Sequence, residues 1–172
     1  MARRTFRLQQ RLAENACGAV MDIPHPIILR DTTASALTKA FQQHWGVRPE
    51  AVVLPVASPD GLFFSVDGLP PIYSGLLGND FDLRRSFESW VSAFAEEGLD
   101  VYLLINSELS FFSIDSLHIE DIAGSGSAHM CINNPRAQEI LGAILGTAID
   151  IAAEQTRTGT GNLRGVVFDA VN

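Results

Sequence analysis

The residue best placed for chemistry is Asp169, which ends the apolar run 163–168. An acid at the end of a buried strand lies at the mouth of an α/β fold, where a carboxylate acts as nucleophile or general base. Glu108 follows a second apolar run, 99–105, and is the candidate partner for a carboxylate pair. Two simpler interpretations remain open. Asp169 can cap a loop by accepting backbone N–H bonds, and Glu108 can be a solvated loop residue.

Side chains suited to binding a sugar follow the same strand ends. An aromatic ring stacks on the face of a sugar, while amides and hydroxyls hydrogen-bond its hydroxyl groups. The residues predicted to bind substrate are Tyr73, Ser74, Asn106, Asn133 and Asn172. We expect no cofactor.

Other motifs predict structure and not chemistry. The spacing of His118, His129 and Cys131 matches no common zinc pattern, so no metal site is predicted. The segment 159–161, Gly-Thr-Gly, precedes a strand, whereas a dinucleotide-binding loop follows one, so it predicts a turn. The segment 124–127, Gly-Ser-Gly-Ser, predicts a flexible linker.

The elements that must position these residues alternate along the chain. Short continuous apolar runs predict strands at 20–29, 51–56, 99–105 and 163–169. Helical spacing predicts helices from Thr32 or Thr33 to His44, over 83–97, and from Asn133 or Asn134 to about Glu154. This alternation favours parallel βαβ units. The long connections, 57–80 and 107–133, both leave the carboxyl end of a strand, where α/β folds build their sites.

Composition narrows the function classes. The 172 residues are 47% hydrophobic and 19% charged, with a net charge of −8. An acidic chain of this kind is a poor partner for nucleic acid or an anionic membrane surface. No apolar segment is long enough to span a bilayer. The N-terminal arginines are not followed by the apolar stretch of a signal peptide, so we expect a cytoplasmic location by default.

Four short motifs resemble one enzyme family. They are Ile72-Tyr73-Ser74; 95–101 (Ala-Glu-Glu-Gly-Leu-Asp-Val) with Ile105-Asn106; 134–139 (Asn-Pro-Arg-Ala-Gln-Glu); and 164–170 (Arg-Gly-Val-Val-Phe-Asp-Ala). In this order they resemble the N-terminal half of the bacterial family-10-like glycoside hydrolases, which are (β/α)8 barrels related in layout to the α-amylases. The resemblance implies that Asp169 is the nucleophile or substrate-binding carboxylate at the end of the fourth strand.

The chain departs from this family at several positions. Arg164 stands where the family usually has Asp, and Ala170 replaces a second Asp. Leu104-Ile105 stands where a tryptophan is common. In similar barrels the acid/base partner comes from a later strand, so a two-carboxylate glycosidase is incomplete in these residues.

The predicted fold class is α/β, a parallel-sheet half of a TIM-type barrel with about four strands and three to four helices. Residues 1–18 are expected to form a helical lead-in and residues 19–172 a (β/α)3β domain truncated at its C-terminus. The predicted function is O-glycosyl hydrolysis of an oligo- or polysaccharide, catalytically incomplete as given. The alternative is a non-catalytic α/β carbohydrate-binding or assembly module. Open sheet edges predict self-association or a complementary half-barrel.

Overall fold

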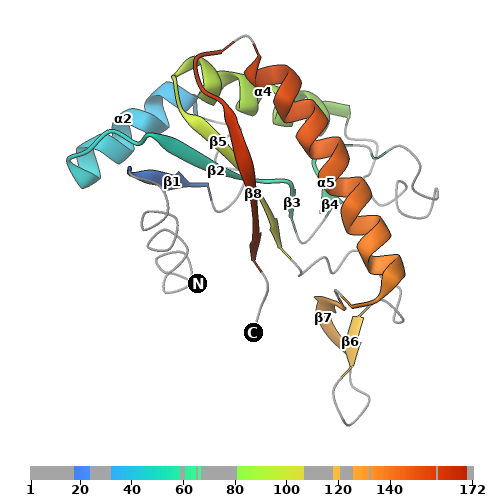
Figure 1. Ribbon diagram of the computed structural model, residues 1–172. Helices are drawn as coiled ribbons and strands as arrows, with labels where there is room; N and C mark the ends of the chain where they lie inside the picture. The colour runs from blue at the N-terminus through green and yellow to red at the C-terminus, as the bar shows by residue number, and fades with distance from the viewer. Residues whose placement is uncertain are drawn as a thin grey trace.

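In the described part of the chain, three α-helices alternate with the four strands of a parallel sheet (Figure 1). The computed structural model describes residues 18–23, 32–58, 61–64, 66, 81–106, 118–120, 126–131, 133–157 and 159–169. The order of the main elements is β1 (Val20–Asp22), α2 (Ala34–Trp45), β2 (Ala51–Pro55), α4 (Phe81–Glu96), β5 (Asp100–Asn106), α5 (Pro135–Thr156) and β8 (Leu163–Asp169). The predicted alternation of strands and helices is confirmed.

The four strands form one parallel sheet in the order β1-β2-β5-β8. Each strand therefore lies beside its predecessor, as the sequence predicts. Within the described residues β1 ends at Asp22, earlier than the predicted 20–29, and residues 24–29 lie outside the described part of the chain. Strand β5 begins one residue later than predicted and includes Asn106.

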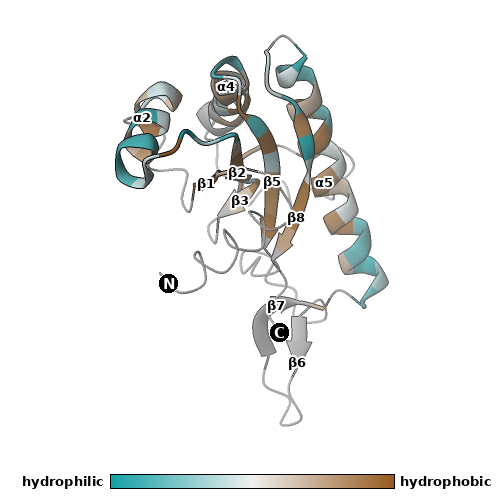
Figure 2. Cartoon of the chain, turned by 60° about the vertical axis from the view of Figure 1, so that its left-hand side comes forward, coloured by the Kyte–Doolittle hydropathy of each residue, from teal (hydrophilic) through white to brown (hydrophobic). Residues whose placement is uncertain are grey.

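All three helices cover the same face of the sheet, which we call the helix face. Strand residues such as Val52, Leu54 and Leu103 join one apolar core with Phe87 and Phe94 of α4. Helix α5 adds further buried side chains to this core: Ile140, Ile144, Ala148 and Ile151. Apolar colour accordingly concentrates on the strands and the adjoining sides of the helices (Figure 2). Strand order that follows the chain, with helices on one face, defines an open, partial (β/α)n half-barrel and differs from a doubly wound sheet.

Capping residues fix the ends of these helices. The Thr33 hydroxyl accepts the amide of Ala36 at 3.2 Å and begins α2, which ends at Gly46 with φ 72°. Asn134, and not Asn133, caps α5, because its side-chain oxygen accepts the amide of Arg136 at 2.9 Å. Helix α4 is followed by Gly98, whose φ of 77° is the left-handed conformation that glycine adopts without strain.

The face of the sheet opposite the helices is partly covered. Val20, Ala51 and Val53 of β1 and β2 are buried there, and Tyr102 and Leu104 of β5 are half-buried beside them. Apolar side chains on this face are therefore more exposed on β5 than on β1 and β2.

Both long connections begin or end in small antiparallel hairpins that the sequence does not predict. Strands β3 (Ala57–Ser58) and β4 (Gly61–Leu62) pair after β2, and β6 (His118–Glu120) pairs with β7 (Gly126–Met130) before α5. Gly126 and Ser127, expected in a flexible linker, belong to β7. After β4 the chain packs against α4, where the ring centroids of Phe64 and Phe87 are 5.2 Å apart.

The turn before β8 lies directly on the end of α4. The amides of Thr160 and Gly161 both donate to the carbonyl of Ala95, at 3.2 and 3.0 Å. A Cβ atom at position 161 would overlap the carbonyl oxygen of Leu99, so only glycine fits there. The Gly-Thr-Gly segment is thus a packed turn, as predicted.

We expect Gly161→Ala to lower the free energy of unfolding by about 2–3 kcal/mol, because rigid backbone must move to accept the methyl group. Urea denaturation measures this loss. The matched control is Gly142→Ala in α5, where nothing lies within 4 Å of the added Cβ. Removing a helical glycine should there stabilise the protein by about 0.5–1 kcal/mol. Equal effects of the two substitutions would contradict the packed turn.

Candidate functional site

The candidate site lies at the carboxyl edge of the sheet, where β5 and β8 end side by side. Asn106 and Asp169 are register partners and are the last residues of their strands. The connections after β2 and β5 leave from this same edge, whereas the connections at the opposite edge, 46–50, 97–99 and 157–162, are short. The edge with the long connections is the one that carries sites in parallel α/β folds.

Strand alternation assigns positions 106 and 169 to the face opposite the helices. Val101, Leu103 and Ile105 belong to the helix-face core, so Tyr102, Leu104 and position 106 lie on the other side of β5. Register partners in a parallel sheet share a face, which places position 169 there too. The structure describes these two residues by their backbone. The face corresponds to the interior of a barrel.

The remaining predicted site residues are not brought to this edge by the described structure. Glu108, Tyr73, Ser74 and Asn172 lie outside the described residues. Asn133 is described and is exposed in the turn ahead of α5. The pairing of Asp169 with Glu108 therefore stays a prediction.

Asp22 is a candidate that sequence reasoning missed. It ends β1, and its register partner Val53 lies on the face opposite the helices. The residue is half-buried, and its Oδ1 atom is shielded from solvent. The available signal was the one that identified Asp169, an acid within an apolar run. The expected strand 20–29 placed Asp22 in mid-strand and so hid its terminal position.

The histidines and cysteine weighed as metal ligands lie at the β6–β7 hairpin. His118 is the register partner of Met130, and Cys131 follows β7 as a free, half-buried thiol. Among the described residues, no group of three or more His, Cys, Asp or Glu side chains is close enough to hold a metal ion.

A hollow of about 280 Å3 lies at the opposite, amino edge of the sheet and includes Asp100, Tyr102 and Arg164 in its lining. Asp100 Oδ2 accepts from Arg164 Nε at 2.6 Å, and its Oδ1 accepts the amide of Asn162 at 3.1 Å. The hydrogen bond to Asp100 raises the pKa of Arg164 above its ordinary value. The β5–β8 register shifts here, between Val101 and Tyr102. We assign this hollow a structural role, because Asp100 holds the start of β8.

Comparisons with known proteins identify no family, so the class of this protein is defined by its fold. No protein-family model, curated protein or solved structure matches the chain. Within the described part of the chain, none of the helices combines the length and apolarity that crossing a bilayer requires. The class that the described residues define is an open (β/α)n half-barrel.

We expect Asp100→Ala to lower the free energy of unfolding by about 1 kcal/mol, since the exposed ion pair contributes little and the accepted Asn162 amide contributes most. Asp100→Asn keeps an oxygen for that amide and should lose roughly half as much. Chemical denaturation of both variants measures the difference. Equal losses would show that the amide bond does not hold the turn.

Proposed function

We propose that the chain is a carbohydrate-active, glycoside-hydrolase-like half-barrel, with Asp169 as its reacting or substrate-binding carboxylate. The observation that supports this proposal is the register pairing of Asp169 with Asn106 at the carboxyl edge of the sheet. A carboxylate beside a side-chain amide is the combination that binds a sugar hydroxyl and attacks or stabilises an anomeric carbon. The substrate class is an oligo- or polysaccharide.

The chemistry of O-glycosyl hydrolysis needs two carboxyl groups. They are about 5–5.5 Å apart in retaining enzymes and about 6.5–9.5 Å apart in inverting ones. In a retaining reaction, Asp169 would attack the anomeric carbon while the second acid protonates the leaving oxygen; water then releases the sugar. Glu108 is the second acid expected from the sequence. Tyr73 would stack on the sugar ring, and Asn106 would hydrogen-bond a hydroxyl.

The second candidate is a non-catalytic carbohydrate-binding module. It is favoured by the described ends of β5 and β8, which carry one carboxylic acid between them, Asp169, opposite an amide. Arg164, at the position where the resembling family usually has Asp, is engaged by Asp100 at the other edge. A single acid binds sugar hydroxyls without cleaving the glycosidic bond.

We expect Asp169→Asn to abolish sugar binding or hydrolysis and to leave the melting temperature nearly unchanged. If Asp169 only caps a loop, the same substitution should instead cost roughly 1 kcal/mol of stability and leave binding intact. Calorimetric titration with an oligosaccharide panel, a reducing-sugar assay and thermal unfolding are measured on one variant.

The matched control is Glu96→Gln, at an exposed acid in the last turn of α4. It removes the same charge far from the carboxyl edge and should change none of the three quantities. Binding by the wild-type protein without hydrolysis would favour the binding module. Unchanged binding and hydrolysis in Asp169→Asn would remove Asp169, and with it the case for a hydrolase.

A further inference from the structure

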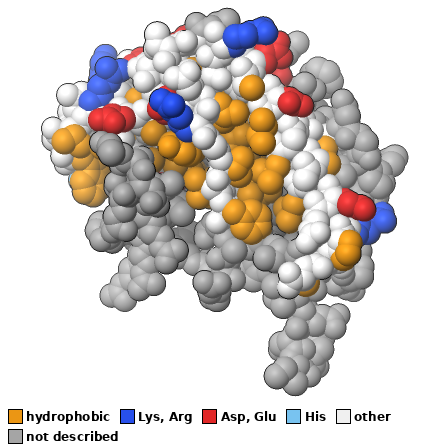
Figure 3. All heavy atoms as spheres, viewed as in Figure 1, with side chains coloured by type: hydrophobic (Ala, Val, Ile, Leu, Met, Phe, Trp, Pro, Cys, Tyr) orange, Lys and Arg blue, Asp and Glu red, His pale blue; other side chains and the backbone are white. Residues whose placement is uncertain are grey.

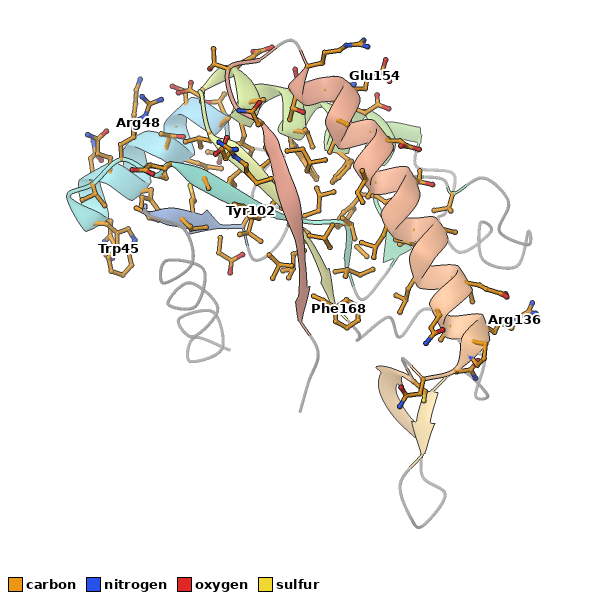
Figure 4. All side chains as sticks on the ribbon, viewed as in Figure 1. Trp45, Arg48, Tyr102, Arg136, Glu154 and Phe168 are labelled. Atoms are coloured by element: carbon orange, nitrogen blue, oxygen red, sulfur yellow. The ribbon has the colours of Figure 1, made fainter. Side chains whose placement is uncertain are left out.

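Strand β8 and helix α5 expose a strip of core-type side chains. Val166 and Phe168 of β8 are 37% and 39% exposed, and Ile149 of α5 is 37% exposed. Leu145, one helical turn from Ile149, is half-buried. Figure 3 shows an apolar patch alongside β8 and α5, and in Figure 4 Phe168 lies near the carboxyl end of β8 on the side toward α5. We call these four residues the β8–α5 strip.

The two β8 residues of the strip lie on the helix face of an edge strand. Val166 and Phe168 are register partners of Leu103 and Ile105, which are fully buried in the core. Strand β5 is contacted by both α4 and α5, whereas the main helix contact of β8 is with α5. The strip therefore marks the place where a further strand and helix would pack.

We propose that a second copy of the chain occupies this place and closes an eight-stranded barrel. A twofold axis parallel to the strands sets β8 of each copy beside β1 of the other, in parallel, so that both seams form at once. These two strands are the outer strands of the described sheet. Eight parallel strands are the number whose interior side chains fill a barrel. The strands lie in the sheet in their order along the chain, so β1 of one copy can follow β8 of the other as each strand follows its predecessor.

Charge and chain order indicate which part of the second copy covers the strip. In an alternating β/α layout, the segment that precedes a strand packs on the helix face, over the junction between that strand and its neighbour. Residues 3–16 precede β1, so in the dimer they would cover the junction of β1 with β8 of the other copy. This segment lies outside the described residues, and its sequence predicts a helix with apolar positions at Phe6, Leu8 and Leu12. Residues 1–17 carry four arginines and one glutamate, which leaves a net charge of −11 on the rest of the chain. Asp150 and Glu154 are exposed beside the strip on α5.

The closed assembly would place a second carboxylate beside Asp169. Asp169 ends β8, and Asp22 ends β1, both at positions on the face opposite the helices. At each seam Asp169 would therefore neighbour Asp22 of the second copy. This step rests on the proposed function for its chemistry, whereas the assembly itself does not.

Sedimentation tests the assembly without any sugar. We expect the wild-type protein to sediment at twice its 18.6 kDa chain mass, and Phe168→Asp or Ile149→Asp to sediment as a folded monomer. Ser89→Asp, which adds the same charge on an exposed position of α4, should remain dimeric. A wild-type monomer at all concentrations, a polymer larger than a dimer, or a dimer unaffected by both strip variants would overturn the proposal.

The shared carboxylates have their own readout. Two acids brought together oppose association, so Asp22→Asn or Asp169→Asn should each tighten the dimer about two- to fivefold at low salt. The double variant should gain little beyond either single one, because one substitution already removes the repulsion. Additive gains, or none, would show that the two acids do not meet.

Mixed dimers then connect the assembly to the proposed function. Asp22→Asn and Asp169→Asn chains are each inactive alone, but their mixed dimer has one seam with both acids. Equal mixing should restore about one quarter of wild-type sugar binding or hydrolysis. Mixing Asp169→Asn with the double variant should restore nothing. Inactivity of the wild type toward sugars refutes the proposed function alone; no rescue in an active protein refutes the shared site.

Discussion

The parallel pairing of β5 with β8 is the constraint on which the rest of the structure depends. Parallel strands must be joined by a crossover that returns along the sheet, and here that crossover contains α5 and the long connection before it. A right-handed crossover places the helix on the same face as α2 and α4. The helix-face core, the meeting of Asn106 with Asp169, and the exposed β8–α5 strip all follow from this one pairing.

Most of the fold could be predicted because its signals are local. Continuous apolar runs identify β2, β5 and β8, and Thr33 and Pro135 identify where α2 and α5 begin. These features depend on burial and capping within a few residues of the element itself. The order of the strands in the sheet was predictable because each pair of consecutive strands is separated by a helix long enough to make a crossover. The connections at one edge are also too long for hairpins between these strands.

The remainder could not be predicted because it depends on which residues meet across the sheet. Asp22 becomes a strand-end acid only because the described β1 stops there, and prolines at 24 and 26 made the whole apolar run resemble one irregular strand. The segment that follows the β3–β4 hairpin packs through Phe63 and Phe64 on α4, and such long-range contacts have no local sequence pattern. Glu108 and Asp169 both follow apolar runs typical of buried strands, and the sequence does not give the distance between their carboxylates.

The register shift at the start of β8 has a consequence for how this chain tolerates change. Leu163 pairs with Val101 and Gly165 with Tyr102, so Arg164 is an extra residue in the ladder. Leu163 and Val166 both lie on the helix face although they are three positions apart, and the extra residue accommodates this odd spacing. Deleting Arg164 would leave residues 165–169 with the partners and faces they have now, and would remove the bulge and the ion pair with Asp100. Homologous chains should therefore be aligned on β8 from Gly165 onward, since a loss of one residue at the bulge leaves the acid on its face of the sheet.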